Sequence, residues 1–211
     1  GDLDVRFHRS TDGIHWLPVG KPGAAVYHGG GSEAAFEFGP EGDLWAALRN
    51  EDGDDTGFGT LLCHAPADHL GRWDCPDVSD PERYDSPRMF RHEGEIYMVA
   101  RRDIGGPYDQ ADPTSTFAEQ QLTNLLSYSG RPKRTAVYHI DRDTAQVVHL
   151  VDLPSAGDTS FPSIQPLDDH TFLVGNYTSP LDDPDLTWID GQVSEDGTQI
   201  YLLTLTFVPS N

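Results

Sequence analysis

Carboxylates and arginines recur at matching places in separate stretches of the sequence. Glu33 lies sixteen residues before Arg49, and Asp85 lies sixteen residues before Arg101. Two carboxyl groups roughly 6.5–9.5 Å apart leave room for the water that inverting glycoside hydrolases activate. Arginines hold anionic groups in paired hydrogen bonds. The spacing therefore predicts a polar site that combines an acid–base pair with a clamp for an anionic group.

The two carboxyl groups are expected to differ in pKa. Asp85, expected in apolar surroundings near Phe161, is the candidate general acid, a role that requires a raised pKa. Glu33, close to Arg49, is expected to stay ionised and to act as the base or as the partner of a tyrosine.

Tyrosines and further polar residues complete the predicted site. In a retaining variant of the reaction, Tyr177 or Tyr128 is the candidate nucleophile. The predicted catalytic residues are thus Glu33, Asp85 and Tyr177. Residues at the strand ends and in the insertion that follows are predicted to bind substrate: Arg49, Arg101, Arg102, Asp103, Arg131, Arg134 and Tyr128.

Three copies of one template position these residues. Each copy reads as a short apolar strand, a polar turn and a second strand, and the copies begin at Glu33, Asp85 and Phe161, 52 and 76 residues apart. Such spacing is typical of propeller blades with one long insertion. It predicts an all-β fold, a β-propeller with about four four-stranded blades in this chain and five or six in the closed ring. Residues 1–211 then form a single domain or the C-terminal portion of one, so that an upstream segment or a second chain completes the ring.

The insertion between the second and third copies, residues 104–133, leaves from the predicted ligand-binding rim. Thr116 and Glu119 have the spacing of a capping box, which predicts one short helix over residues 117–127. We expect this helix to lie over the channel mouth and to carry Tyr108, Tyr128 and Arg131 towards the site. A purely structural cap on the rim is the alternative.

Composition excludes several classes of function. The chain has 14 Lys and Arg against 35 Asp and Glu, a formal charge of −21, and such a surface repels nucleic acid and anionic lipid. No apolar run of about 18 residues exists, so no membrane span is predicted. The histidines form no zinc motif. No cofactor is predicted, although the acidic stretch 51–56 could bind calcium; a solvated turn is the simpler interpretation.

Two cysteines bear on the compartment. Cys63 and Cys75 flank a predicted hairpin and would face each other across it, at a distance that a disulfide can bridge. Two buried free thiols are the alternative. A secreted or periplasmic location is expected, and a cytoplasmic one stays open.

The segment Ser10-Thr-Asp-Gly-Ile-His-Trp16 resembles the Asp-box, or BNR repeat, of the sialidase (neuraminidase) superfamily, one residue shorter. In that family the Ser and Asp bond turn amides, and the Trp packs between sheets. The spacing from Glu33 to Arg49 is also similar to the family's. The resemblance implies a propeller fold, with Glu33 as the base for a tyrosine nucleophile and Arg49 as part of a clamp for a sugar carboxylate.

The same resemblance offers Arg131 or Arg134 as the third arginine of that clamp. At the position of the family's nucleophilic tyrosine, however, this sequence has Phe161, and a phenyl ring cannot attack a sugar. The family's first arginine and its acid–base aspartate have no counterpart in this chain.

Two functions follow from these observations. The first is a sialidase-like glycoside hydrolase or related carbohydrate-active enzyme, acting on a glycan, an acidic sugar included, in the central funnel. The second is a non-catalytic propeller that binds a glycan or acidic ligand, or serves as a scaffold.

Overall fold

A computed structural model describes residues 2–208, and almost all of its regular structure is β. Four short strands come first: β1 (Leu3–Val5), β2 (His8–Arg9), β3 (Leu17–Pro18) and β4 (Tyr27–Gly29). They pair as β1 with β4 and β2 with β3.

Three larger antiparallel sheets follow. The first sheet contains β5 (Glu33–Phe38), β6 (Leu44–Arg49) and β7 (Thr60–Ala65). The second contains β8 (Asp85–His92), β9 (Glu95–Asp103), β10 (Lys133–Asp141) and β11 (Gln146–Leu153). The third contains β12 (Thr159–Pro166), β13 (Thr171–Thr178) and β14 (Gln199–Thr206). The predicted all-β fold is confirmed.

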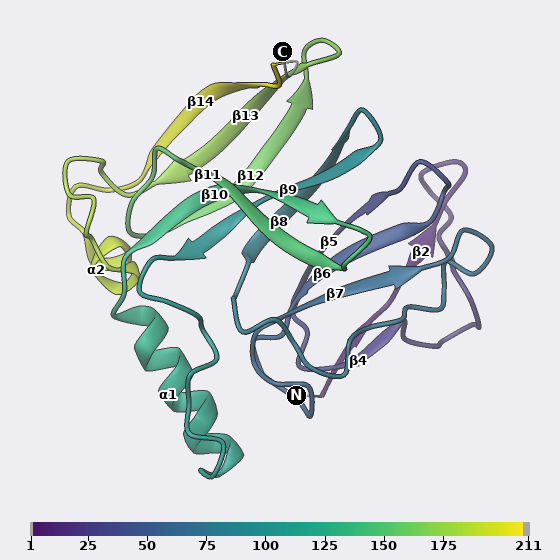
Figure 1. Cartoon of the computed structure of the whole chain (residues 1–211), viewed down its shortest axis with the longest axis horizontal. Coiled ribbons are helices and arrows are strands. Elements are labelled where there is room, and N and C mark those ends of the chain that lie inside the picture. Colours follow the sequence, from purple (N-terminus) through teal and green to yellow (C-terminus); the bar gives the residue numbers. More distant parts are fainter. Residues whose placement is uncertain (1, 209–211) are drawn as a thin grey trace.

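The three sheets lie side by side, joined through their first strands (Figure 1). Strand β8 contacts both β5 and β12. Apolar side chains fill the spaces between neighbouring sheets: Trp45, Met98 and Tyr138 belong to the cluster between the first two. Phe90 and Phe172 belong to the cluster between the second and third. Each such side chain contributes about 1.5–3 kcal/mol when fully buried, so these seams hold the blade-like sheets in place.

The pairing register confirms the rim expected from the template. Glu33 is opposite Arg49, and Asp85 is opposite Arg101. In the third sheet Tyr177 is opposite Ser160 rather than Phe161, because a β-bulge shifts the register of β12 after Ser160. The strand starts and ends predicted to share one rim therefore do share it.

Other expectations need correction. Within residues 2–208 only the second sheet has four strands; β7 has just two isolated bridges, at Asp74 and Asp80, in place of a fourth strand. In the predicted Asp-box turn, Ser10 accepts from the Gly13 amide at 2.8 Å. Trp16, however, is 61% exposed, so its predicted packing between sheets is wrong: β2 and β3 form a separate two-stranded sheet.

The insertion contains the predicted helix, α1 (Phe117–Ser129), with a complete capping box between Thr116 and Glu119. A second helix, α2 (Trp188–Val193), was not predicted and lies between β13 and β14. The two helices lie at the same end of the sheets (Figure 1). No helix in residues 2–208 has both the length and the apolar character to cross a membrane.

The two cysteines form a disulfide, Cys63–Cys75, which settles the alternative left open by the sequence. Their backbones are adjacent because His64 and Asp74 pair across the same hairpin.

Candidate functional site

The first strands of the three sheets begin around one hollow of about 320 Å³. This hollow is at the place where the sequence predicts the channel mouth. The residues that line it are Glu33, Ala34, Ser86, Pro87, Phe161 and Pro162.

Glu33 is the carboxylate at this hollow. Arg49 Nη1 is 2.7 Å from its Oε1, and the Ser86 amide donates to its Oε2 at 2.6 Å. Ser86 has a φ of 50° in the bulged start of β8, and this conformation directs its N–H towards Glu33. Although both oxygens are held, the side chain stays 29% exposed. Glu33 can therefore reach a ligand in the hollow with a fixed orientation.

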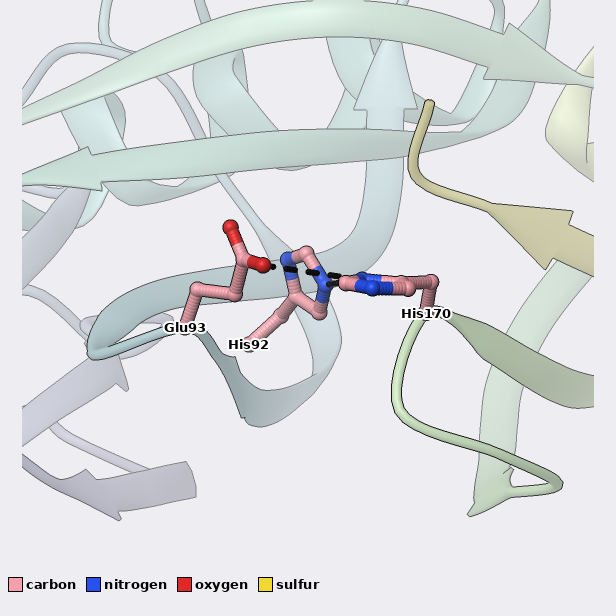
Figure 2. A group of neighbouring side chains, drawn as sticks. All are labelled: His92, Glu93 and His170. Carbon is pink, nitrogen blue, oxygen red and sulfur yellow. Dashed lines mark hydrogen bonds and ion pairs between the residues drawn. The ribbon is translucent and has the colours of Figure 1, made fainter. Parts of the chain in front are cut away.

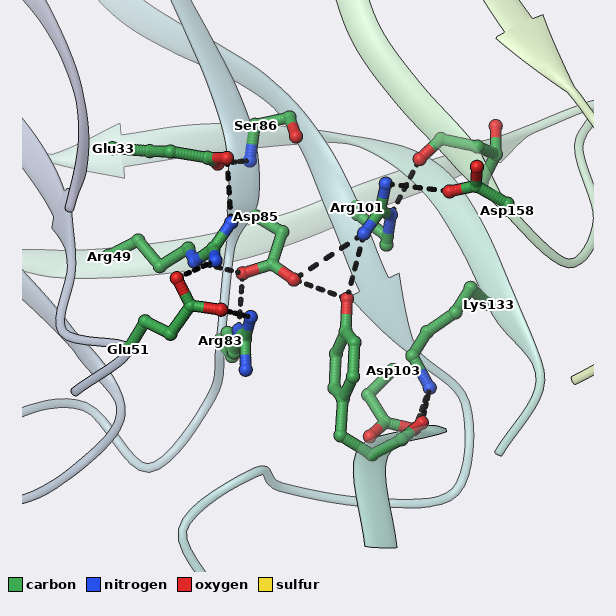
Figure 3. A network of polar contacts seen from close by, with 12 residues as sticks. Glu33, Arg49, Glu51, Arg83, Asp85, Ser86, Arg101, Asp103, Lys133 and Asp158 are labelled. Atoms are coloured by element: carbon green, nitrogen blue, oxygen red, sulfur yellow. Dashed lines mark hydrogen bonds and ion pairs between the residues drawn. The ribbon is translucent and has the colours of Figure 1, made fainter. Parts of the chain in front are cut away.

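Asp85 lies deeper, at the centre of a buried polar cluster (Figure 3). Its side chain is completely buried. Arg83 Nε is 2.5 Å and Arg49 Nε 3.2 Å from Oδ1, and Arg101 Nη1 is 3.6 Å from Oδ2. Tyr128 also donates its hydroxyl to Oδ2.

These partners overturn the predicted acid role of Asp85. Burial raises the pKa of a carboxyl group, but the charges of the three arginines and the hydrogen bond from Tyr128 outweigh it, and the pKa of Asp85 is lowered. Asp85 is thus an ionised, inaccessible carboxylate. The prediction of a raised pKa is wrong because it placed Asp85 against Phe161 and left out Arg83.

Arg83 is a site residue that sequence reasoning missed. It is almost fully buried, and its guanidinium lies over the rings of Tyr108 and Tyr128, 4.5 and 4.3 Å from their centroids. The available signal was its position two residues before Asp85 on an extended segment, where side chains two apart share a face.

Glu51 was missed in the same way. Its carboxylate bridges two cations, pairing with Arg49 and, at 3.0 Å, with Arg83. Nearby, the Asp54 carboxylate accepts hydrogen bonds from the Tyr27 hydroxyl and the Gly30 amide. In the acidic stretch considered for calcium, the Glu51 and Asp54 carboxylates are therefore already bound to protein partners.

Arg101, on β9 of the second sheet, pairs with a further carboxylate that sequence reasoning missed: Asp158, which directly precedes β12 of the third sheet. Arg101 Nη2 is 3.1 Å from Asp158 Oδ1, and the Tyr177 hydroxyl donates to the same oxygen at 2.9 Å. The pKa of Tyr177 is raised to about 12, chiefly by burial. The negative charge of Asp158 also raises this pKa, and the positive charge of Arg101 lowers it. Tyr177 therefore stays protonated near neutral pH, and as a nucleophile it would need a base to take its proton; the carboxylate that its hydroxyl contacts is Asp158 rather than Glu33.

Several predicted substrate-binding residues lie outside this cluster. Arg102 pairs with Asp152 on β11 at 3.0 Å, because alternate side chains of β9 point to opposite faces. Arg131 binds Asp103 at 3.4 Å and the Pro107 carbonyl at 3.0 Å, so it holds the insertion together. Arg102, Asp103 and Arg131 thus make structural contacts within the protein.

Lys133 and Arg134 lie where the insertion returns to β10. The Lys133 ammonium is buried between the Tyr128 carbonyl, at 2.5 Å, and Asp103 Oδ1, at 3.7 Å, and burial lowers its pKa to about 8. Arg134 donates to the Lys133 carbonyl at 2.9 Å. Tyr128, by contrast, does reach the site as predicted, through Asp85 and Arg101.

Phe161 presents its ring to solvent at the hollow. It is 62% exposed and lies nearly parallel to the Tyr177 ring, 6.2 Å away. Ser160 and Phe161 have φ values of 105° and 59°, a region that residues with a Cβ rarely adopt. Strained backbone of this kind persists where the surrounding structure enforces it, and it is enriched at ligand sites. Here it displays a flat apolar surface beside Glu33.

Inside the cluster the carboxylates outnumber the arginines by one. Three buried arginines, Arg49, Arg83 and Arg101, face four carboxylates: Glu33, Glu51, Asp85 and Asp158. Each of these arginines is ion-paired with at least one carboxylate of the cluster. The arrangement can hold Glu33 and Phe161 in fixed orientations at the hollow.

The sequence matches no family model and no curated protein. Solved structures are similar in fold. An α-L-arabinanase of Penicillium chrysogenum bound to arabinobiose has a TM-score of 0.51 at 12% identity, over 84% of this chain and 46% of its own. An α-L-arabinofuranosidase of Fusarium graminearum bound to an iminosugar inhibitor has a TM-score of 0.51 at 9% identity, over 97% of this chain and 49% of its own.

A β-fructofuranosidase variant of Bombyx mori bound to sucrose has a TM-score of 0.51 at 13% identity, over 96% of this chain and 41% of its own. The chain thus spans less than half the length of each of these three structures. What they show is a β-propeller fold of the kind found in glycoside hydrolases, without singling out the sialidase type.

Proposed function

We propose that this chain forms part of a propeller glycoside hydrolase whose funnel takes a neutral glycan. The observation that carries the proposal is the hollow that Glu33 and Phe161 share. Aromatic rings supply apolar contact surface in ligand sites, while a few placed polar groups fix the ligand's orientation. A carboxylate beside a sugar can act as base or nucleophile in glycoside hydrolysis. The arabinanase and fructofuranosidase likenesses support this ligand class.

Asp85 is the reason for proposing a neutral glycan. An acidic sugar would need arginine donors that it can reach, but the three arginines are buried and Asp85 already occupies the space between Arg49, Arg83 and Arg101. A sialidase-like reaction on an acidic sugar is the second candidate, favoured by the gathering of arginines at one rim. It requires the ligand to displace internal carboxylates that are ion-paired and buried.

Within the proposed reaction Glu33 is the base or nucleophile. Asp85 positions Arg49, which in turn holds Glu33. Apart from Glu33, no carboxyl group of residues 2–208 lines this hollow. The Cys63–Cys75 disulfide favours the expected secreted or periplasmic location, which stays a prediction.

Glu33→Gln tests the catalytic assignment. We expect turnover of arabino- or fructo-oligosaccharides to fall by at least about a hundredfold, because the amide cannot accept a proton or attack the sugar. Glu37→Gln is the matched control, since Glu37 lies on the same strand but away from the hollow. Wild-type turnover in Glu33→Gln would contradict the assignment. Binding of these sugars by the wild type without any turnover would favour the non-catalytic alternative.

A further inference from the structure

A second group of chemically capable side chains lies at the hairpin turns, at the end of the sheets opposite the rim. His92 is the last residue of β8, Glu93 begins the turn to β9, and His170 comes from the turn between β12 and β13 (Figure 2). One ligand atom from each of the three lies within 4.8 Å of the others. The group therefore bridges the second and third sheets.

The spacing of the nitrogens suits a tetrahedral metal ion. His92 Nε2 is 3.0 Å from His170 Nδ1, and His170 Nδ1 is 3.6 Å from Glu93 Oε1. Zinc–nitrogen bonds of about 2.0 Å at tetrahedral angles separate neighbouring ligand atoms by roughly 3.3 Å. The two ring nitrogens now face each other in a hydrogen bond, which the binding of a metal ion would replace. Only small side-chain movements separate this arrangement from a coordinated one.

Both histidines are held in place by contacts outside the group. The His92 ring is buried and stacks on Phe207, with centroids 4.1 Å apart and planes 18° from parallel. The His170 amide donates to Asp168 Oδ1 at 2.9 Å, and the His170 carbonyl accepts from the Phe207 amide at 2.9 Å. Ligands that are ordered in advance lose less conformational freedom when they bind.

Glu93 takes its position from the turn itself. Glu93 and Gly94 have φ values of 50° and 87°, and two successive residues with positive φ form the type I′ turn preferred in two-residue hairpins. The turn places the Glu93 carboxylate at a hollow of about 370 Å³, which Glu95, Tyr97 and both histidines also line. This hollow is separate from the one at Glu33 and leaves room for a water as the fourth ligand.

We propose that His92, Glu93 and His170 bind a divalent transition-metal ion, Zn²⁺ by preference, across the seam between the second and third sheets. Two imidazoles and one carboxylate select zinc and its neighbours over Ca²⁺ or Mg²⁺, which prefer oxygen ligands. The net charge of −21 favours cation binding anywhere on the surface, so the argument for this location rests on the three side chains. The bound ion would tie two sheets together at the end opposite the funnel.

Calorimetric titration of tag-free, chelator-treated protein with zinc chloride tests this proposal. We expect one Zn²⁺ per chain with a micromolar or tighter Kd, a rise in Tm with the metal, and the intense visible bands of tetrahedral Co²⁺ when cobalt is used instead. His170→Ala should weaken binding at least tenfold and abolish the cobalt bands. His170 is half-exposed, so this variant is chosen over one at the buried His92.

His69→Ala is the matched control, because His69 is also exposed and paired with a carboxylate, Asp68, on another loop. It should bind Zn²⁺ as the wild type does. Equal affinities in His170→Ala and the wild type would overturn the proposal, as would a wild-type Kd weaker than about 100 μM. Glu93→Gln gives an independent check: unchanged affinity and unchanged cobalt bands would remove Glu93 from the ligand set.

Discussion

At the scale of single residues, Asp85 organises the site rather than reacting in it. It is the shared counter-charge of Arg49, Arg83 and Arg101, and through Arg49 it fixes Glu33. A buried carboxylate in such a position is hard to replace, because its removal leaves buried cations without a partner.

Asp85→Asn should therefore lower the free energy of unfolding by about 3–5 kcal/mol. Because the folded-state pKa of Asp85 is lowered, its stabilising contribution is complete above the unfolded-state pKa, near 4. The contribution is lost as the pH falls further. Urea unfolding at pH 7 and at pH 3 should thus show a large difference between variant and wild type at pH 7 and a smaller one at pH 3.

Asp152→Asn is the control for this measurement, since Asp152 pairs with Arg102 at a half-exposed site. The loss there should be about 1 kcal/mol or less. Equal losses in the two variants would contradict the special place of Asp85.

The sequence predicted part of this residue-scale arrangement. Repetition of the template predicted that Glu33 would face Arg49 and that Asp85 would face Arg101, since antiparallel register follows from strand length and turn length. It could not predict the charge state of Asp85. That state depends on Arg83, which precedes the template, and on Tyr128, which comes from the insertion.

At the scale of elements, Tyr128 of α1 connects the insertion to the polar cluster at the rim. Asn124 and Tyr128 are the buried residues of this helix, while Leu122, Leu125 and Leu126 are exposed. The Tyr128 hydroxyl donates to Asp85 and accepts from Arg101 at 3.1 Å. The helix is thus fastened to the rim by the same cluster that holds Glu33.

Tyr128→Phe should loosen α1 without unfolding the sheets. It removes a hydroxyl from two buried charged partners, at an expected cost of about 1–3 kcal/mol. Hydrogen exchange should become faster in residues 117–129, while β9 and β10 keep their protection. Leu126→Ala, an exposed change on the same helix, should leave exchange unaltered. Unchanged exchange in both variants would show that α1 does not depend on this anchor.

Elements also show where local signals suffice. The capping box at Thr116 and Glu119 predicted the start of α1 because both partners are local in sequence. Thr187 caps α2 through the Asp190 amide, a comparable signal, but six residues are too few for periodicity to stand out. The bulge at Ser160 and Phe161 was beyond prediction, since neither residue is one that favours positive φ.

At the scale of the whole molecule, three sheets share a rim for a ligand and an opposite end with the proposed metal group. Repeats predicted the arrangement of these sheets because each blade buries its faces only against its neighbours. They did not predict the strand count, since the residues after β7 pair with it only at Asp74 and Asp80. Completion of the ring by an upstream segment or a second chain stays a prediction.

The most direct test of the neutral-glycan funnel is a comparison of sugar binding by the wild type and Phe161→Ala, with Phe117→Ala as a control for an exposed ring elsewhere. Titration calorimetry should show that arabino- or fructo-oligosaccharides bind the wild type and Phe117→Ala alike. Binding to Phe161→Ala should be at least tenfold weaker, because the ring supplies the apolar contact surface. Sialyllactose should not bind. The proposed neutral-glycan site would be contradicted if sialyllactose bound tightly, if Arg49→Ala abolished that binding, and if the neutral oligosaccharides did not bind.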